Sequence, residues 1–199
     1  MITNTLKYLF IKPAMIYILL VLGHTVNGQE VDSPSEIAVE TAVEKIGDYA
    51  QYGPVIASLT MIIVKNDKDG FWQFTKSMGG NLAATWTLKY AIDKRRPEGR
   101  LDGHAFPSGH TSFAFQGASF LHRRYGWKYG IPAYIVASFV AYSRLEGINT
   151  RHDGWDVLGG IITGIGSTYL FTTPYARDHF KLNFESTNGS YQFGVTYNF

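Results

Sequence analysis

The 199-residue sequence contains no cysteine and no dense run of lysine and arginine. Without cysteine the chain has no disulfide bond, no thiolate metal site and no cysteine nucleophile, so its stability must come from packing. The formal net charge is only +2. These features exclude the electrostatic footprint of a nucleic-acid-binding protein.

Long apolar runs are also scarce. A membrane-spanning helix needs roughly 20 largely apolar residues, whereas shorter runs are typical of buried core helices. Only Val157 to Ala176 reaches that length, and it contains four glycines. Since the mean hydropathy is −0.07, we expect a soluble or peripheral helical bundle, with an integral inner-membrane protein as the alternative.

Apolar and aromatic residues are plentiful, at 45% and 15% of the chain, which is enough for one sizeable core. Residues 1–28 are typical of a signal peptide or an N-terminal anchor, because lysines precede an apolar stretch and no acidic residue occurs before Glu30. Either interpretation predicts export to the cell envelope. Residues 29–177 are expected to form one helical domain, followed by a separate C-terminal element in residues 178–199.

Apolar periodicity and turn residues predict a mainly α fold, a bundle of about six helices. Ser35 is the expected N-cap of the first helix, residues 66–70 are expected to form a charged loop, and residues 126–130 are expected to connect two helices. The predicted helices cover residues 36–49, 53–64, 71–93, 108–123, 131–144 and 153–173.

The C-terminal tail follows a different pattern. Apolar residues alternate with polar ones from Phe180 to Phe199, on both sides of Asn188-Gly189. A period of two around an Asn-Gly pair is typical of a β-hairpin. We expect this hairpin to pack its apolar face on the helices or on a partner.

Three clusters place polar residues at the ends of apolar helices. In chain order they are Lys89 to Arg96-Pro97, then Pro107-Ser108-Gly109-His110, then Ser143-Arg144 with His152 and Asp156. Each alone has a plain structural explanation: a solvated helix end, a serine N-cap, or a His–Asp pair on one helical face. Together they contain what an anion-transfer site requires.

These residue types suit a phosphate group. Guanidinium and ammonium groups bind phosphate oxygens, so Lys89, Arg96 and Arg144 are candidate phosphate ligands. Ser108 and Gly109 open a helix, where unsatisfied N–H groups and the helix dipole favour an anion. Fixed positive groups around the equatorial oxygens lower the barrier to in-line phosphoryl transfer. This set requires no metal and no other cofactor.

Two imidazoles remain for the chemistry. His152 is the candidate nucleophile, because Asp156 one turn later can hold one ring nitrogen and leave the other unprotonated. Asp153 is expected to point away from that helical face. His110, on a different helix, is the candidate general acid that protonates the leaving oxygen.

The order of these motifs resembles that of the type 2 phosphatidic acid phosphatase superfamily, which includes lipid phosphate phosphatases, class A acid phosphatases and vanadium-dependent haloperoxidases. Lys89 to Pro97 fits the pattern of Lys, six residues, Arg-Pro, and Pro107 to His110 fits Pro-Ser-Gly-His. The resemblance spans about residues 53–173. The third motif departs from the family, since seven residues rather than the usual five separate Arg144 from His152.

The resemblance implies a phosphoric ester hydrolase that is metal-independent and acts on a phosphorylated lipid or another phosphomonoester. By this resemblance His152 forms a phosphohistidine oriented by Asp156, and His110 is the general acid. Lys89, Arg96 and Arg144 bind phosphate with Ser108 and Gly109. Arg151 is the alternative to Arg144, because of the longer third motif.

Two other functions stay open. A vanadium haloperoxidase would use the same pocket to hold vanadate, and a non-catalytic envelope protein would carry the charged clusters as inert helix ends. The expected partners are the phosphorylated substrate and the membrane surface, and not nucleic acid. Neither the particular phosphate ester nor the oligomeric state follows from the sequence.

Overall fold

The structure, a computed structural model, describes residues 33–97, 103–147, 152–176, 180–187 and 190–197. The chain divides into two units, Met1–Val39 and Glu40–Phe199. The predicted signal or anchor segment, residues 1–28, lies outside the described residues. The candidate site lies in the second unit.

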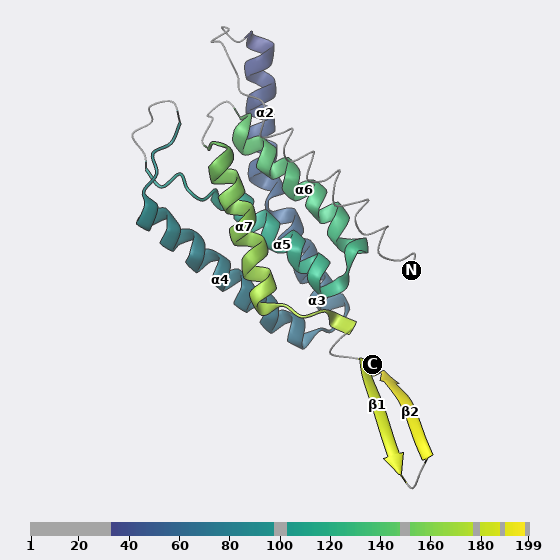
Figure 1. The fold of residues 1–199 in the computed structure, drawn as a ribbon. Helices are drawn as coiled ribbons and strands as arrows, with labels where there is room; N and C mark the ends of the chain where they lie inside the picture. The colour runs from purple at the N-terminus through teal and green to yellow at the C-terminus, as the bar shows by residue number, and fades with distance from the viewer. Residues whose placement is uncertain (1–32, 98–102, 148–151, 177–179, 188–189, 198–199) are drawn as a thin grey trace, which may run out of the picture. The chain divides into compact units, whose positions relative to one another are not determined.

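The fold is mainly helical, as the sequence predicts (Figure 1). Each predicted helix has a counterpart within a few residues at either end. The helices are α2 (Pro34–Ala50), α3 (Tyr52–Val64), α4 (Lys68–Ile92), α5 (Gly109–Tyr125), α6 (Trp127–Leu145) and α7 (Gly154–Phe171).

Helix α5 is the centre of the bundle, and it packs against α3, α4, α6 and α7 (Figure 1). Ala118 and Leu121 of α5 belong to a core that also contains Val140 of α6 and Val157 of α7. Phe120, which is fully buried, belongs to a second core formed with residues of α3 and α4. Small and apolar side chains on several faces let α5 be covered all round.

Two glycines of α7 set the spacing between α7 and α5. A Cβ atom on Gly160 would lie 2.6 Å from the carbonyl oxygen of Ser108, and one on Gly164 would lie 2.9 Å from the backbone nitrogen of Gln116. Only glycine allows this close approach. It brings the first residues of the two helices together, and the Ser108 N–H donates to the Asp156 carbonyl oxygen at 2.8 Å.

Three predicted helix ends are wrong, each for a local reason. Ser33 rather than Ser35 caps α2, since the Glu36 N–H donates to Ser33 Oγ and the Ser33 N–H donates to Glu36 Oε2. The Asp67 carboxylate accepts from the Gly70 N–H at 2.8 Å, which starts α4 inside the predicted loop. Gly126, at φ +92°, joins α5 directly to α6, so residues 127–130 are helical.

An antiparallel pair of strands lies where the alternating pattern predicts a hairpin. Strand β1 (Phe180–Thr187) pairs with β2 (Ser190–Tyr197), and Phe184 is opposite Phe193. The predicted turn residues, Asn188-Gly189, lie outside the described residues. The side chains of Phe184, Tyr191, Phe193 and Val195 are exposed.

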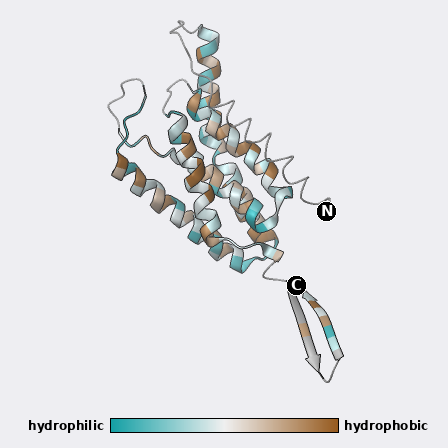
Figure 2. Ribbon diagram, viewed as in Figure 1, coloured by the Kyte–Doolittle hydropathy of each residue, from teal (hydrophilic) through white to brown (hydrophobic). Residues whose placement is uncertain are grey.

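Hydrophobic and hydrophilic residues are mixed along the helices (Figure 2). Among the described residues, none of the helices combines the length and the apolar character needed to cross a membrane.

Candidate active site

The C-terminal end of α4 and the N-terminal ends of α5 and α7 meet at one place. A Cβ atom on Gly109 would lie 3.8 Å from Lys89 Cε, so the start of α5 is beside the last turn of α4. Lys94, just after α4, donates to Asp156 Oδ1 at 2.8 Å and so reaches α7. These three helices therefore bring residues of all three predicted motifs to one end of the bundle, while Ser143 and Arg144 of the third motif lie on α6.

Lys89 and Arg96 supply positive charge at this place. Lys89 is partly buried, and its ammonium group donates to the His104 carbonyl oxygen at 2.7 Å. Burial lowers the pKa of Lys89 and the nearby Arg96 lowers it further, while Asp156 opposes the shift. Two mutually repelling cations held together are suited to bind an anion.

Ser108 and Gly109 start α5 beside these cations. Ser108 is fully buried at the N-cap position. The plain structural alternative, in which the Ser108 hydroxyl accepts from a first-turn N–H, does not hold among the described contacts: the hydroxyl accepts from Thr111 Oγ1 at 3.0 Å. The first-turn N–H groups are therefore not capped by this hydroxyl, which suits an anion site at a helix N-terminus.

His152 lies immediately before α7 and is 5% exposed. The prediction that His152 and Asp156 share a helical face is wrong, because the helix begins at Gly154. The pair still meets: Nδ1 of His152 lies 3.5 Å from Asp156 Oδ2, longer than a hydrogen bond. This buried nitrogen has no hydrogen-bond partner among the described residues.

The pKa of His152 is lowered. Burial is the largest cause and outweighs the nearby Asp156, while Arg96 and Lys89 lower the pKa further. The imidazole is thus neutral at neutral pH, with Nδ1 on the side of the carboxylate and Nε2 remaining for chemistry. A neutral imidazole backed by a carboxylate is what a histidine nucleophile requires.

Asp156 is fully buried and is held from three sides. His152 lies beside its carboxylate, which accepts from Lys94 and from the Asp153 N–H, while the Asp153 carboxylate accepts from the Asp156 N–H in a capping box. Burial alone would raise the pKa of Asp156, but His152 and Lys94 lower it overall. Asp153 was expected to point away; instead it caps α7 and shares Lys94 with Asp156.

His110 and Arg144 form a second group, joined by a residue that the sequence did not single out. Asp48 of α2 accepts from Arg144 Nη1 at 2.8 Å, and the same Oδ1 atom lies 3.3 Å from His110 Nε2. Arg144 is 2% exposed, and its other nitrogens donate to the Glu44 carbonyl oxygen and to Ser143 Oγ. His110 follows Gly109 directly, so this group adjoins the first one through α5.

The described structure thus brings Lys89, Arg96, the start of α5, His152 and Asp156 together, and links His110 to Arg144 through Asp48. Arg151, the alternative phosphate ligand, lies outside the described residues. Lys94 and Asp48 were missed because ion pairs between distant elements leave no spacing signal. Within the described ranges, no three histidine, aspartate or glutamate side chains are grouped as a metal site requires.

Comparison with known proteins agrees with this geometry. A sequence profile of the PAP2 superfamily matches residues 56–179. The chain belongs to the PAP2 superfamily. The family resemblance inferred from the three motifs is therefore confirmed, and the described site lies within the matched range except for the contributions of α2.

Curated PAP2 relatives include lipid A phosphatases. A lipid A 4'-phosphatase of Helicobacter pylori is 27% identical over 170 residues, which cover 79% of this chain and 84% of the relative. A lipid A 1-phosphatase of Porphyromonas gingivalis is 41% identical over 91 residues, 44% of this chain. The chain spans 19% of the length of that Porphyromonas relative. The expected enzyme class, phosphoric ester hydrolase, is the class of these relatives.

Two solved structures share the PAP2 fold of this chain. LpxE of Aquifex aeolicus has a TM-score of 0.54 at 19% identity and covers 78% of this chain and 92% of its own. A transmembrane PAP2 type phosphatidylglycerolphosphate phosphatase of Bacillus subtilis has a TM-score of 0.52 at 22% identity, covering 85% of this chain and 86% of its own. At these identities the likeness concerns the fold.

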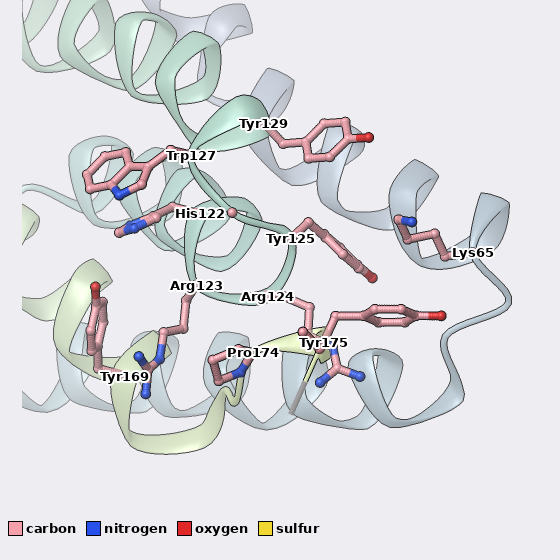
Figure 3. A pocket seen from close by; sticks show the side chains of 12 residues that line it. Lys65, His122, Arg123, Arg124, Tyr125, Trp127, Tyr129, Tyr169, Pro174 and Tyr175 are labelled. Carbon is pink, nitrogen blue, oxygen red and sulfur yellow. The ribbon is translucent and has the colours of Figure 1, made fainter. Parts of the chain in front are cut away.

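A cavity of about 440 Å³ lies at the other end of α5 (Figure 3). Its lining contains neither His110 nor His152, so it is separate from the PAP2 site. Basic and aromatic side chains from the ends of α3, α5 and α7, from the start of α6 and from the segment after α7 surround it, among them Lys65, Arg123, Tyr125, Tyr169 and Tyr175.

Proposed function

We propose that the chain is a metal-independent phosphatase that hydrolyses a phosphomonoester, a phosphorylated lipid above all, through a phosphohistidine intermediate. The observation that carries this proposal is the buried, neutral His152 beside Asp156 and next to the cations Lys89 and Arg96. A nucleophile, its orienting carboxylate and charge for a phosphoryl group then occupy one site.

In the first step, His152 Nε2 attacks phosphorus in line with the leaving oxygen. A P–N bond forms and the P–O bond to the leaving group breaks, while His110 gives its proton to the departing oxygen. Lys89, Arg96 and the N–H groups at the start of α5 stabilise charge on the equatorial oxygens. Asp156 stabilises the positive charge that develops on the imidazole.

In the second step, water attacks the phosphohistidine and His110 accepts a proton from it. The P–N bond breaks, inorganic phosphate leaves, and His152 is neutral again. This exchange of roles between acid and base follows from microscopic reversibility. In this proposal Arg144 has two roles. It binds Asp48, and it forms an ion pair with the substrate phosphate.

The lipid nature of the substrate is supported by the named activities of the relatives and by the surface of the chain. Ile63 and Val64 at the end of α3 are 77% and 74% exposed, and Leu170 of α7 is 78% exposed. Ile63 and Val64 are neighbours in the sequence, and exposed apolar side chains that lie together mark interaction surfaces. We place the enzyme at the bacterial cell envelope, at the periplasmic face of the membrane, in line with the export expected from residues 1–28.

The test is phosphate release by the purified chain from a panel of lipid phosphates, including lipid A phosphates, and from a soluble ester. The proposal predicts release with EDTA present, inhibition by vanadate, and loss of at least about a thousandfold in kcat for His152→Ala. Activity that survives His152→Ala would contradict the proposal. Asp69→Asn, at an exposed position in the first turn of α4, is a control for handling of the variants.

A further inference from the structure

Asp48 lies outside the three motifs and outside the range matched by the PAP2 profile, residues 56–179. Its Oδ1 atom lies 2.8 Å from Arg144 Nη1 and 3.3 Å from His110 Nε2. One carboxylate oxygen on α2 therefore contacts both a cation of α6 and an imidazole of α5.

The position of Asp48 is fixed by packing. A Cβ atom on Gly47, the preceding residue, would overlap the Ser143 side chain, so α2 and α6 are in close contact here. Arg144, nearly fully buried, also donates to the Glu44 carbonyl oxygen of α2. A buried guanidinium with this many fixed partners is a rigid support for the carboxylate.

The geometry points to Asp48 as a positioning residue for His110, an inference that rests on the proposed phosphatase function. The carboxylate holds Nε2 and favours the protonated imidazole, so that the other ring nitrogen delivers the proton to the leaving oxygen. Among the described residues, the charged groups of the site at the first turn of α5 are Asp48 of α2, Lys89 of α4, Arg96 after α4, Arg144 of α6, and His152 with Asp156 at α7. Removal of the Asp48 charge leaves His110 beside an uncompensated Arg144.

The first experiment compares pH profiles of kcat for wild type and Asp48→Asn on a soluble phosphomonoester. We expect the basic limb, which reports loss of the proton from His110, to move down by about one pH unit. The acidic limb, set by His152, stays in place. Asp48→Glu restores the basic limb, and Glu146→Gln, which removes an exposed charge just after α6, leaves both limbs unchanged.

A purely structural role for Asp48 would lower kcat at every pH without moving one limb, and that result overturns the inference. The imidazole titration of His110, followed by NMR and assigned by its loss in His110→Gln, gives the same answer without turnover. A wild type that hydrolyses nothing refutes the proposed function, whereas an unmoved His110 titration in Asp48→Asn refutes the role of Asp48. Asp48→Ser provides the same readout should the Asn variant unfold.

A separate observation concerns the cavity at the other end of α5. Lys65 and Arg123, which line it, form no ion pair within the described part of the chain, and Asp67, two residues after Lys65, is bound by Arg124 and Tyr125. Lys65 Nζ lies 5.2 Å from the centre of the Tyr175 ring, and Arg123 Cζ lies 4.8 Å from that of Tyr169 (Figure 3). Ring faces hold these cations without neutralising their charge.

We infer that this cavity binds the phosphate group of an anionic amphiphile. Lys65 and Arg123 would contact phosphate oxygens, and Tyr125, Tyr169 and Tyr175 would contact the apolar atoms next to it. Basic and aromatic side chains combine in this way where proteins meet anionic lipid surfaces.

The test is equilibrium binding of the full chain, in a His152→Ala background, to vesicles of phosphatidylcholine with and without phosphatidylglycerol. We expect Lys65→Gln/Arg123→Gln to bind the anionic vesicles at least about tenfold more weakly than the control Lys45→Gln/Lys76→Gln, which removes two exposed lysines elsewhere. Equal binding by the two double variants refutes the site. Competition by glycerol phosphate shows whether the phosphate group is enough for binding or the whole lipid is needed. Lys65→Gln alone changes one exposed side chain, and its binding to the anionic vesicles is compared with that of wild type in the same way.

Discussion

At the scale of single residues, the proposed nucleophile is the buried imidazole of His152, and its charge state predicts a pH dependence. Its pKa is lowered by burial and by Arg96 and Lys89. The neutral form is the nucleophile, so activity is lost as the pH falls through this lowered pKa. We therefore expect the acidic limb of the kcat profile below about pH 6.5, the ordinary value for histidine. An acidic limb above pH 7 contradicts this reading of the site.

The ion pair of Asp67 predicts how the free energy of unfolding depends on pH. It is buried, and it accepts two hydrogen bonds from Arg124, at 2.7 and 2.8 Å, and one from Tyr125. Burial alone would raise the pKa of Asp67, but the bonds from Arg124, the Gly70 N–H and Tyr125 lower it overall. Asp67→Asn removes the carboxylate that binds the buried Arg124 guanidinium and should lower the free energy of unfolding by about 3–5 kcal/mol at neutral pH.

The sign of the pH dependence follows from the lowered pKa. The stabilisation by Asp67 is present above the ordinary aspartate pKa of about 4 and is lost as the pH falls through the folded-state value. Denaturant unfolding of wild type and Asp67→Asn at several pH values checks this. A difference that stays constant from neutral to strongly acidic pH would count against the ion pair as its source.

At the scale of helices, the contact between α5 and α7 positions the site, and its glycines offer a matched pair of variants. A Cβ atom on Gly164 would overlap the Ser112 carbonyl oxygen, whereas one on Gly166 meets nothing within 4 Å. We expect Gly164→Ala to destabilise the fold by about 1–3 kcal/mol. Gly166→Ala should be neutral or stabilising by about 0.5–1 kcal/mol, because alanine favours a helix.

Thermal or denaturant unfolding of the two glycine variants measures this difference directly. Similar stabilities for Gly164→Ala and Gly166→Ala would mean that α7 does not approach α5 as closely as described. The four glycines of the longest apolar run in the sequence would then need another explanation.

The helices could be predicted because the periodic spacing of apolar residues is visible in the sequence without knowledge of the tertiary fold. Their ends were less predictable. In the sequence, Asp67 is indistinguishable from the other residues of a charged turn, and Gly126 is indistinguishable from the residues of a longer connection. Lys89, Arg96, Ser108 and His152 could be predicted as site residues because they lie at or near helix ends and follow one another in the order of the family motifs. Asp48 and Lys94 were not found, because their roles depend on which helix ends meet in space.

At the scale of the whole molecule, exposed apolar side chains bear on where the enzyme works. Replacing Ile63 and Val64 by serine removes two of the most exposed ones without altering the site. We expect Ile63→Ser/Val64→Ser to raise KM for a lipid phosphate presented in vesicles and to leave hydrolysis of a soluble ester unchanged. An equal effect on both substrates would assign these residues to the fold rather than to the lipid surface.

The measurement that tests the central claim most directly is the trapping of a covalent intermediate. Purified chain is mixed with substrate labelled in its phosphate, quenched in alkali, and digested for mass spectrometry. The account predicts label on the imidazole of His152, and none in His152→Ala. Rapid phosphate release with label on another residue, or with no labelled protein at any time after mixing, would contradict it.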